Sequence, residues 1–178
     1  MPEASRDAIR SATRKLVRHT YINSWHMGDV ESVAMWRLYA PSGQGVAILS
    51  SFEGLRDSLT CTETVFIGKV KYVDPDKEFI PEGNALYPFV HKRCSFDYER
   101  ELRAVFQPFP VVNGRIELDT PSPIGCALAV DVAKLVLSVF VAPRQPNWFR
   151  EAVESVVAAF GPPGVRVVQS DLDRDPLY

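Results

Sequence analysis

The stretch from residue 96 to residue 103 holds the densest set of chemically active side chains in this sequence. It places five charges and two aromatic rings directly before an apolar run, in the order Phe96-Asp97-Tyr98-Glu99-Arg100-Glu101-Leu102-Arg103. If the chain is extended from residue 99, Glu99, Glu101 and Arg103 share one face of a strand, with alternate Cα atoms about 7 Å apart. Two carboxylates so placed can hold different pKa values, which suits a general acid or base. Glu101 would also suit the stabilisation of positive charge on a sugar ring.

Two other interpretations of the same residues stay open. If the stretch is helical, Asp97 and Glu101, and likewise Glu99 and Arg103, are i,i+4 neighbours on a solvated face with no chemical role. Alternatively, Glu99, Glu101 and Arg103 form a partly buried ion network with Lys92, and that network specifies the fold. Spacing alone slightly favours the solvated face.

Aromatic and basic residues elsewhere are candidates for a binding pocket. Trp25, Trp36 and Tyr39 suit the stacking of a base or nicotinamide, although aromatic residues at such positions most often belong to a core. Trp25 stands beside His26 at the end of a predicted strand, which makes it the better candidate for the rim of a pocket. Further candidate binding residues are Lys92 and Arg93, for phosphate, together with Tyr98 and Arg103.

No metal site is expected, and no cofactor can be named from these residues. The three histidines and three cysteines form no C-x-x-C or H-x-x-x-H pattern, and the only close pair is His91 with Cys94. An odd number of widely spaced cysteines argues against a disulfide framework and for a reducing compartment, so a cytoplasmic location is expected.

The composition of the 178 residues is that of an ordinary soluble globular protein, with 46% hydrophobic and 24% charged residues. A net charge of −2 gives no general attraction to nucleic acid or to anionic membranes. No signal peptide and no run long enough to cross a bilayer is apparent, so no membrane partner is expected. Arg6, Arg10 and Arg14 recur every four residues near the start. They form either a basic stripe for nucleic acid or a solvated helix face.

Periodicity predicts a mixture of helices and strands without strict alternation. Helices are expected over residues 5–17, 53–59, 84–92 and 146–160 and from an N-cap at Asp29 through Ala40, and strands over 19–25, 46–50, 65–73, 102–106, 115–118, 127–130, 135–141 and 165–168. Short turns between several strands favour an α+β fold: a single domain with a twisted, largely antiparallel sheet flanked by about four helices. Residues 1–178 then comprise a basic helix (1–18), a core (19–170) and a tail (171–178).

The order of motifs from Trp25 to Pro143 resembles a widespread prokaryotic family that is known only as a domain of unknown function. The motifs that carry the resemblance are Trp25, Ser32, Met35-Trp36, Leu38-Tyr39-Ala40, Gly43, Gly45-Val46-Ala47-Ile48, Gly68-Lys69-Val70-Lys71-Tyr72, His91-Lys92-Arg93, Ser95-Phe96, Tyr98-Glu99, Glu101, Arg103-Ala104 and Val141-Ala142-Pro143. Some members of that family accompany abortive-infection and phage-defence genes. The resemblance covers roughly residues 20 to 170 and implies a bacterial defence setting, but no reaction.

A looser likeness is to ADP-ribosyltransferases. In those enzymes a polar residue, a serine-bearing strand and a late E-x-E follow in order, as do His19 or Tyr21, then Ser50-Ser51, then Glu99-Arg100-Glu101 here. This likeness implies an enzyme that transfers a glycosyl group from NAD, in which Glu101 steadies an oxocarbenium-like transition state and Glu99 activates the acceptor. The alternative is a non-catalytic sensor domain of a defence system that binds nucleic acid or a protein.

Overall fold

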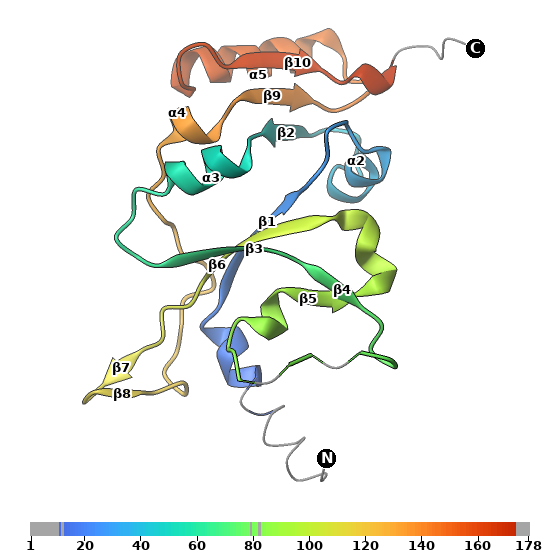
Figure 1. The fold of residues 1–178 in the computed structure, drawn as a ribbon. Coiled ribbons are helices and arrows are strands. Elements are labelled where there is room, and N and C mark those ends of the chain that lie inside the picture. Colours follow the sequence, from blue (N-terminus) through green and yellow to red (C-terminus); the bar gives the residue numbers. More distant parts are fainter. Residues whose placement is uncertain (1–10, 12, 79, 82, 174–178) are drawn as a thin grey trace. The chain divides into compact units, whose positions relative to one another are not determined.

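The structure is a computed structural model, and it describes residue 11 and residues 13–78, 80–81 and 83–173 (Figure 1). The chain forms two compact units, each assembled from two separate stretches. Unit 1 comprises residues up to Met27 together with Glu63–Ala127, and unit 2 comprises Gly28–Thr62 together with the residues from Leu128 onward. Each unit is described by itself below.

Unit 1 is built on a three-stranded antiparallel sheet in the order β1-β6-β3. Its strands are β1 (Tyr21–His26), β6 (Glu101–Phe106) and β3 (Val65–Lys69). The central strand β6 is the most deeply buried, and Val105 is 1% exposed. Burial of this strand places the charged residues at its start inside the unit rather than at its surface.

Short elements surround this sheet in unit 1. Strand β4 (Lys71–Val73) pairs in parallel with β5 (His91–Arg93), and β7 (Val111–Val112) forms a hairpin with β8 (Arg115–Ile116). Two 3₁₀ helices, η1 (Tyr87–Phe89) and η2 (Cys94–Glu99), flank β5. Helix η2 ends at Arg100 with a φ of 44°, and this left-handed residue turns the chain into β6.

Unit 2 contains a mixed sheet in the order β10-β9-β2, with β10 parallel and β2 antiparallel to the central strand β9. Its elements are α2 (Val33–Tyr39), β2 (Val46–Leu49), α3 (Phe52–Ser58), α4 (Val132–Leu135), β9 (Ser138–Val141), α5 (Asn147–Phe160), β10 (Arg166–Gln169) and η3 (Asp171–Asp173). Helix α5 joins the two parallel strands, as a parallel connection requires. Val141 and Ala142, at the end of β9, are almost completely buried.

The fold class predicted from the sequence is confirmed: the protein is α+β, and its strands pair mostly antiparallel. The strands belong to several small sheets, of which the two largest have three strands each. A single domain over residues 1–178, with its core at 19–170 and a tail at 171–178, stays a prediction. The predicted first helix is present over residues 13–18, while Arg6 and Arg10 lie outside the described residues.

Four local predictions differ from the structure, either in the element that forms or in the residue at which it begins. The helix predicted over 84–92 is one 3₁₀ turn followed by β5, since Pro88 lacks an N–H and β4 supplies a strand partner. Ser32, not Asp29, caps α2. The strand predicted over 135–141 begins only at Ser138, because Asp131 caps the short helix α4 before it. The stretch 127–130 forms no strand; it makes one isolated bridge, between Leu59 and Val130.

Candidate functional site

Four charged side chains of the predicted site meet inside unit 1, and we call Lys92, Glu99, Glu101 and Arg103 the ion cluster. The ammonium nitrogen of Lys92 donates to Glu99 Oε2 at 2.6 Å and to Glu101 Oε1 at 2.9 Å. Arg103 donates from Nε to Glu101 Oε2 at 2.8 Å and from Nη2 to Oε1 at 3.0 Å, a two-pronged contact. Its Nη1 donates to the carbonyl oxygen of Phe89 at 2.7 Å. Each carboxylate is therefore paired with at least one cation.

Three elements bring the cluster together. Strand β5 supplies Lys92, η2 supplies Glu99, and β6 supplies Glu101 and Arg103, which point to one face because they are two residues apart. The extended interpretation was therefore right for Glu101 and Arg103. It was wrong for Glu99, because the chain is 3₁₀ helical there and turns at Arg100 before the strand begins.

Neighbouring backbone contacts fix these elements. His26 stands opposite Glu101 in the β1–β6 register, and its Nδ1 lies 2.7 Å from the carbonyl oxygen of Glu99, to which it donates. The backbone N–H of Glu101 donates to the hydroxyl of Tyr72 at 2.8 Å. The backbone N–H of Met27 donates to the carbonyl oxygen of Arg100 at 2.8 Å. The turn between η2 and β6 is thus tied to the end of β1 by His26 and Met27, and to β4 by Tyr72.

Burial and neighbouring charges act in opposite directions on the pKa values of Glu101 and Lys92. Glu101 is 4% exposed and Glu99 7%. Burial by itself raises the pKa of Glu101, but hydrogen bonds from Arg103, Lys92 and Ser24 outweigh burial and hold that pKa well below its ordinary value of 4.5. Burial likewise lowers the pKa of Lys92, and the two carboxylates outweigh it and raise that pKa. Glu101 and Lys92 are therefore both charged at neutral pH.

This arrangement limits what Glu101 can do chemically. A carboxylate held ionised by two cations has no proton to donate, and its low pKa makes it a weak base. Both of its oxygens already accept hydrogen bonds from Lys92 or Arg103. The geometry therefore favours the ion-network interpretation over the general acid–base one.

The predicted aromatic residues are not part of the ion cluster. Trp25 is half-buried on β1 and its indole N–H donates to Asn23. Trp36 and Tyr39 belong to α2 of unit 2, where Trp36 donates to Glu31 Oε2 at 2.9 Å and Tyr39 is 72% exposed. The structure therefore assigns Trp25 and the two other residues to separate units.

A second set of residues lies on η2 and directly before and after it, and we call Arg93, Phe96, Tyr98 and Arg100 the η2 face. All four side chains are exposed, with Phe96 at 39% and Tyr98 at 44%. Lys92 Nζ lies 4.8 Å from the centroid of the Phe96 ring, a cation–π contact that holds one side of that ring. Sequence reasoning missed Phe96 and Arg100 as binding residues, although two aromatic residues between two arginines are visible in the sequence from 93 to 100.

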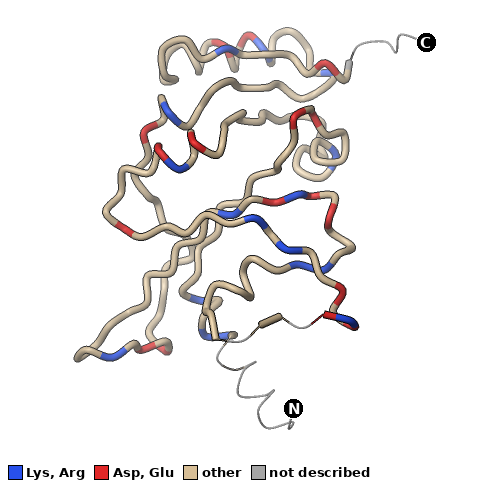
Figure 2. The backbone as a smooth tube through the Cα atoms, viewed as in Figure 1, with Lys and Arg blue, Asp and Glu red and all other residues tan. Residues whose placement is uncertain are grey.

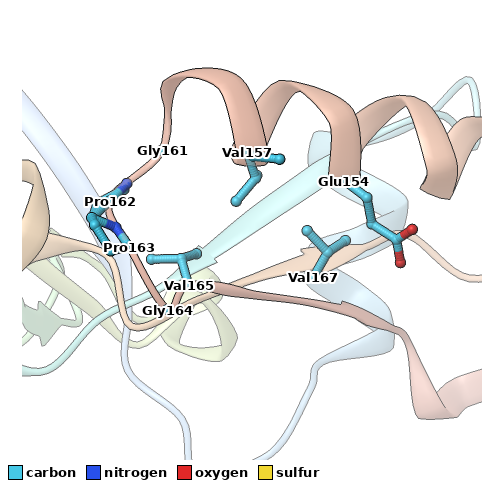
Figure 3. Close-up of a pocket in the computed structure, with 9 residues that line it drawn as sticks. Glu154, Val157, Gly161, Pro162, Pro163, Gly164, Val165 and Val167 are labelled. Carbon is cyan, nitrogen blue, oxygen red and sulfur yellow. The ribbon is translucent and has the colours of Figure 1, made fainter.

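Each unit has a hollow among its described residues. One, of about 460 Å³, lies in unit 2 between the end of α5 and β10 (Figure 3). Valine and proline side chains line it, and Glu154 is its one charged residue, so it offers little for catalysis. The other, of about 410 Å³, lies in unit 1 and is lined by residues of the stretches 17–21 and 121–124. Neither hollow is lined by a residue of the ion cluster.

The residues that carried the likeness to ADP-ribosyltransferases have other roles in this fold. His19 is completely buried. Ser51 caps α3 by accepting from the backbone N–H of Gly54 at 2.9 Å. Ser50 and Ser51 belong to unit 2, whereas Glu101 belongs to unit 1. The likeness therefore gains no support from these positions.

Comparison of the chain with protein-family models, with curated proteins and with solved structures finds no match in any of the three. The resemblance to a family of unknown function stays a prediction. Over the described residues, no helix has the length and apolar character needed to span a membrane.

The first prediction concerns Lys92. Replacing it with methionine keeps the stem but leaves Glu99 and Glu101 buried with less compensating charge, so Lys92→Met should lower the free energy of unfolding by about 3–5 kcal/mol in urea. Lys71→Met is the matched control, because Lys71 and its partner Glu78 form an exposed pair. It should change stability by about 1 kcal/mol or less. Equal effects of the two variants would contradict a stabilising role for the cluster.

The second prediction concerns acid stability. The pKa of Glu101 is lower in the folded than in the unfolded protein. Its contribution to the free energy of unfolding is therefore complete above about pH 4.5. That contribution is lost as the pH falls below this value, because the unfolded chain takes up the proton first. Glu101→Gln should therefore lower stability at pH 7 and flatten the decline between pH 5 and pH 3. Urea titrations at several pH values measure this, with the exposed Glu78→Gln as control. A decline as steep as in the wild type would refute the assignment.

Proposed function

We propose that the η2 face binds single-stranded nucleic acid, and that the ion cluster beneath it holds this face in position rather than doing catalysis. The observation that carries the proposal is the exposure of two aromatic rings, Phe96 and Tyr98, between two exposed guanidinium groups, Arg93 and Arg100. Single-strand binding sites combine such rings, on which bases stack, with cations that contact phosphates.

The two kinds of side chain would contribute in different ways. Stacking of a base on an aromatic ring is worth about 1–3 kcal/mol and tolerates any base. Arg93 and Arg100 would contact phosphates and release counterions, so their part of the affinity falls with salt. Phe96 has Lys92 on one side of its ring, which leaves the opposite side for a base. Asp97 is exposed on the same helix and opposes the two arginines, so modest affinity is expected.

Positive charge near the η2 face is in large part balanced by neighbouring acids. Figure 2 shows Lys and Arg positions along the β4–β5 part of unit 1, with Asp and Glu positions close to them. Lys71 and Arg93 are exposed residues of these two paired strands, and Lys71 is paired with Glu78. Of these two cations, Arg93 is therefore the one that the proposed surface uses, which fits a modest affinity. The predicted basic stripe contributes only Arg14 to the described residues, where it is exposed on the first helix.

Preorganisation is the role that the ion cluster would play in binding. The C-terminal end of η2 is tied down, by the contact of Lys92 with Glu99 and by that of Met27 with Arg100. A segment that is already ordered loses less conformational entropy when a ligand binds. The buried charges would therefore act on binding indirectly, by fixing the rings and guanidinium groups above them.

The cellular setting of this function is also a proposal. Cys94 and Cys126 carry free, exposed thiols, which suits a reducing compartment such as the cytoplasm. A sensor for single-stranded nucleic acid would fit the bacterial defence setting that the family resemblance implies.

A glycosyl transfer from NAD is the second candidate, and one observation favours it. Glu101 is a sheltered carboxylate that stays ionised, as the stabilisation of an oxocarbenium-like transition state requires. Against it, hydrogen bonds from Lys92 and Arg103 already reach both oxygens of that carboxylate, so an incoming sugar hydroxyl would have to displace one of them.

The third prediction tests the η2 face with a fluorescent oligothymidylate of ten nucleotides in an anisotropy titration. Phe96→Ala and Tyr98→Ala should each weaken binding about 10-fold or more without changing its salt dependence. The double change Arg93→Ala, Arg100→Ala should weaken binding and lower the salt slope by about 1–2.

Arg115→Ala is the control for this titration, because Arg115 is an exposed arginine of unit 1 that lies outside the η2 face. It should bind as the wild type does. Absence of binding by the wild type at low salt, or equal losses in Arg115→Ala and the η2 variants, would overturn the proposal.

The fourth prediction separates binding from NAD chemistry. If the ion cluster is structural, the wild type and Glu101→Gln should both leave NAD intact over hours in the presence of candidate acceptors, as followed by liquid chromatography. Glu101→Gln should also retain oligonucleotide binding under conditions in which it is folded. Consumption of NAD by the wild type that Glu101→Gln abolishes would establish the enzymatic candidate instead.

A further inference from the structure

The hollow of about 410 Å³ in unit 1 contains a serine that is hydrogen-bonded to a buried histidine. Ser122 lines the hollow, and its hydroxyl oxygen lies 2.5 Å from Nδ1 of His19. The other ring nitrogen, Nε2, lies 2.9 Å from the carbonyl oxygen of Leu118. His19 is completely buried, whereas Ser122 is half-buried at the wall of the hollow.

The two contacts of His19 define its tautomer. A carbonyl oxygen only accepts hydrogen bonds, so Nε2 carries the proton that it donates to Leu118. In the neutral ring Nδ1 is then without a proton and accepts from the hydroxyl of Ser122. This is the arrangement of an activated nucleophile: a hydroxyl donates to a base, and a third group orients the base.

The surrounding loop is held in place around Ser122. Pro121 and Pro123 flank it and restrict the backbone on both sides. The phenolic hydroxyl of Tyr21, on β1, donates to the carbonyl oxygen of Pro123 at 2.8 Å. The loop is therefore attached to the same strand that follows His19, and the distance between hydroxyl and imidazole is maintained by both.

We propose that Ser122 and His19 form a catalytic pair for acyl transfer to water, with small esters or thioesters of apolar acyl groups as the substrate class. The walls support this class, because Val17 and Ile124 offer apolar surface while Arg18 contributes a cation. Arg18 would stabilise the negative charge that develops on the carbonyl oxygen during attack. This site is independent of the η2 face, with which it shares no residue.

The reaction balances with water as the only co-reactant. Ser122 Oγ forms a bond to the acyl carbon as its proton passes to His19 Nδ1, and the resulting tetrahedral intermediate expels the alcohol or thiol, which takes the proton from His19. Water then attacks the acyl-serine ester and gives a proton to His19. The serine ester bond breaks, Ser122 regains its proton from His19, and the carboxylic acid leaves.

The test uses the purified full chain with two probes, diisopropyl fluorophosphate and p-nitrophenyl acetate. The fluorophosphate should add once to the native protein, and peptide mapping by mass spectrometry should place the adduct on Ser122. Ser122→Ala should remove the adduct and lower the rate of p-nitrophenyl acetate hydrolysis about 100-fold or more, with an unchanged circular dichroism spectrum. Ser95→Ala, which alters an exposed serine elsewhere in unit 1, should leave both unchanged.

Two results would overturn the proposal without depending on any variant. The first is that the native protein reacts with the fluorophosphate no faster than the same protein unfolded in urea. The second is an adduct on a residue other than Ser122. His19→Gln adds a further check, because a folded protein that loses the base should also lose labelling of Ser122.

Discussion

The ammonium group of Lys92, placed between the carboxylates of Glu99 and Glu101, is the interaction on which the arrangement of unit 1 depends. It joins β5, η2 and the start of β6, three elements whose side chains would otherwise bring two buried negative charges together. Removal from water costs each of these charges several kcal/mol, and close pairing must repay it. The attraction between the charges offsets this desolvation cost only if all three elements are in place. The cluster therefore specifies their arrangement as well as stabilising it.

The same cluster separates two kinds of charged residue that the sequence presents side by side. Glu99 and Glu101 are turned inward and satisfied by neighbours, and they have little capacity left for a ligand. Arg93 and Arg100, from the same stretch, are exposed beside two exposed rings. In the proposed function, binding would therefore fall to the exposed cations and rings, and the acids would hold the segment that carries them.

The second chemically suggestive place in unit 1 depends on another principle, a hydroxyl aligned with a fixed imidazole. His19 and Ser122 are 103 residues apart and meet because the loop that contains Ser122 returns to the start of β1. A buried histidine whose two ring nitrogens are both hydrogen-bonded needs no chemical role to explain it. The hollow is what makes this pair chemically relevant, because it gives Ser122 access to solvent.

The sequence by itself determined the α+β class, the long helix α5, the strand character of β1, β6 and β9, and the importance of the stretch around Glu101, because these follow from local periodicity and composition. It also included the ion network of Lys92, Glu99, Glu101 and Arg103 among its interpretations. Only the tertiary structure favoured this interpretation over the others. Solvated, catalytic and buried carboxylates can have the same spacing in the sequence, and they differ only in the side chains that surround them. Only the tertiary structure paired His19 with Ser122, because a contact between residues 103 positions apart leaves no local pattern in the sequence. It also assigned Trp25 and Trp36 to different units.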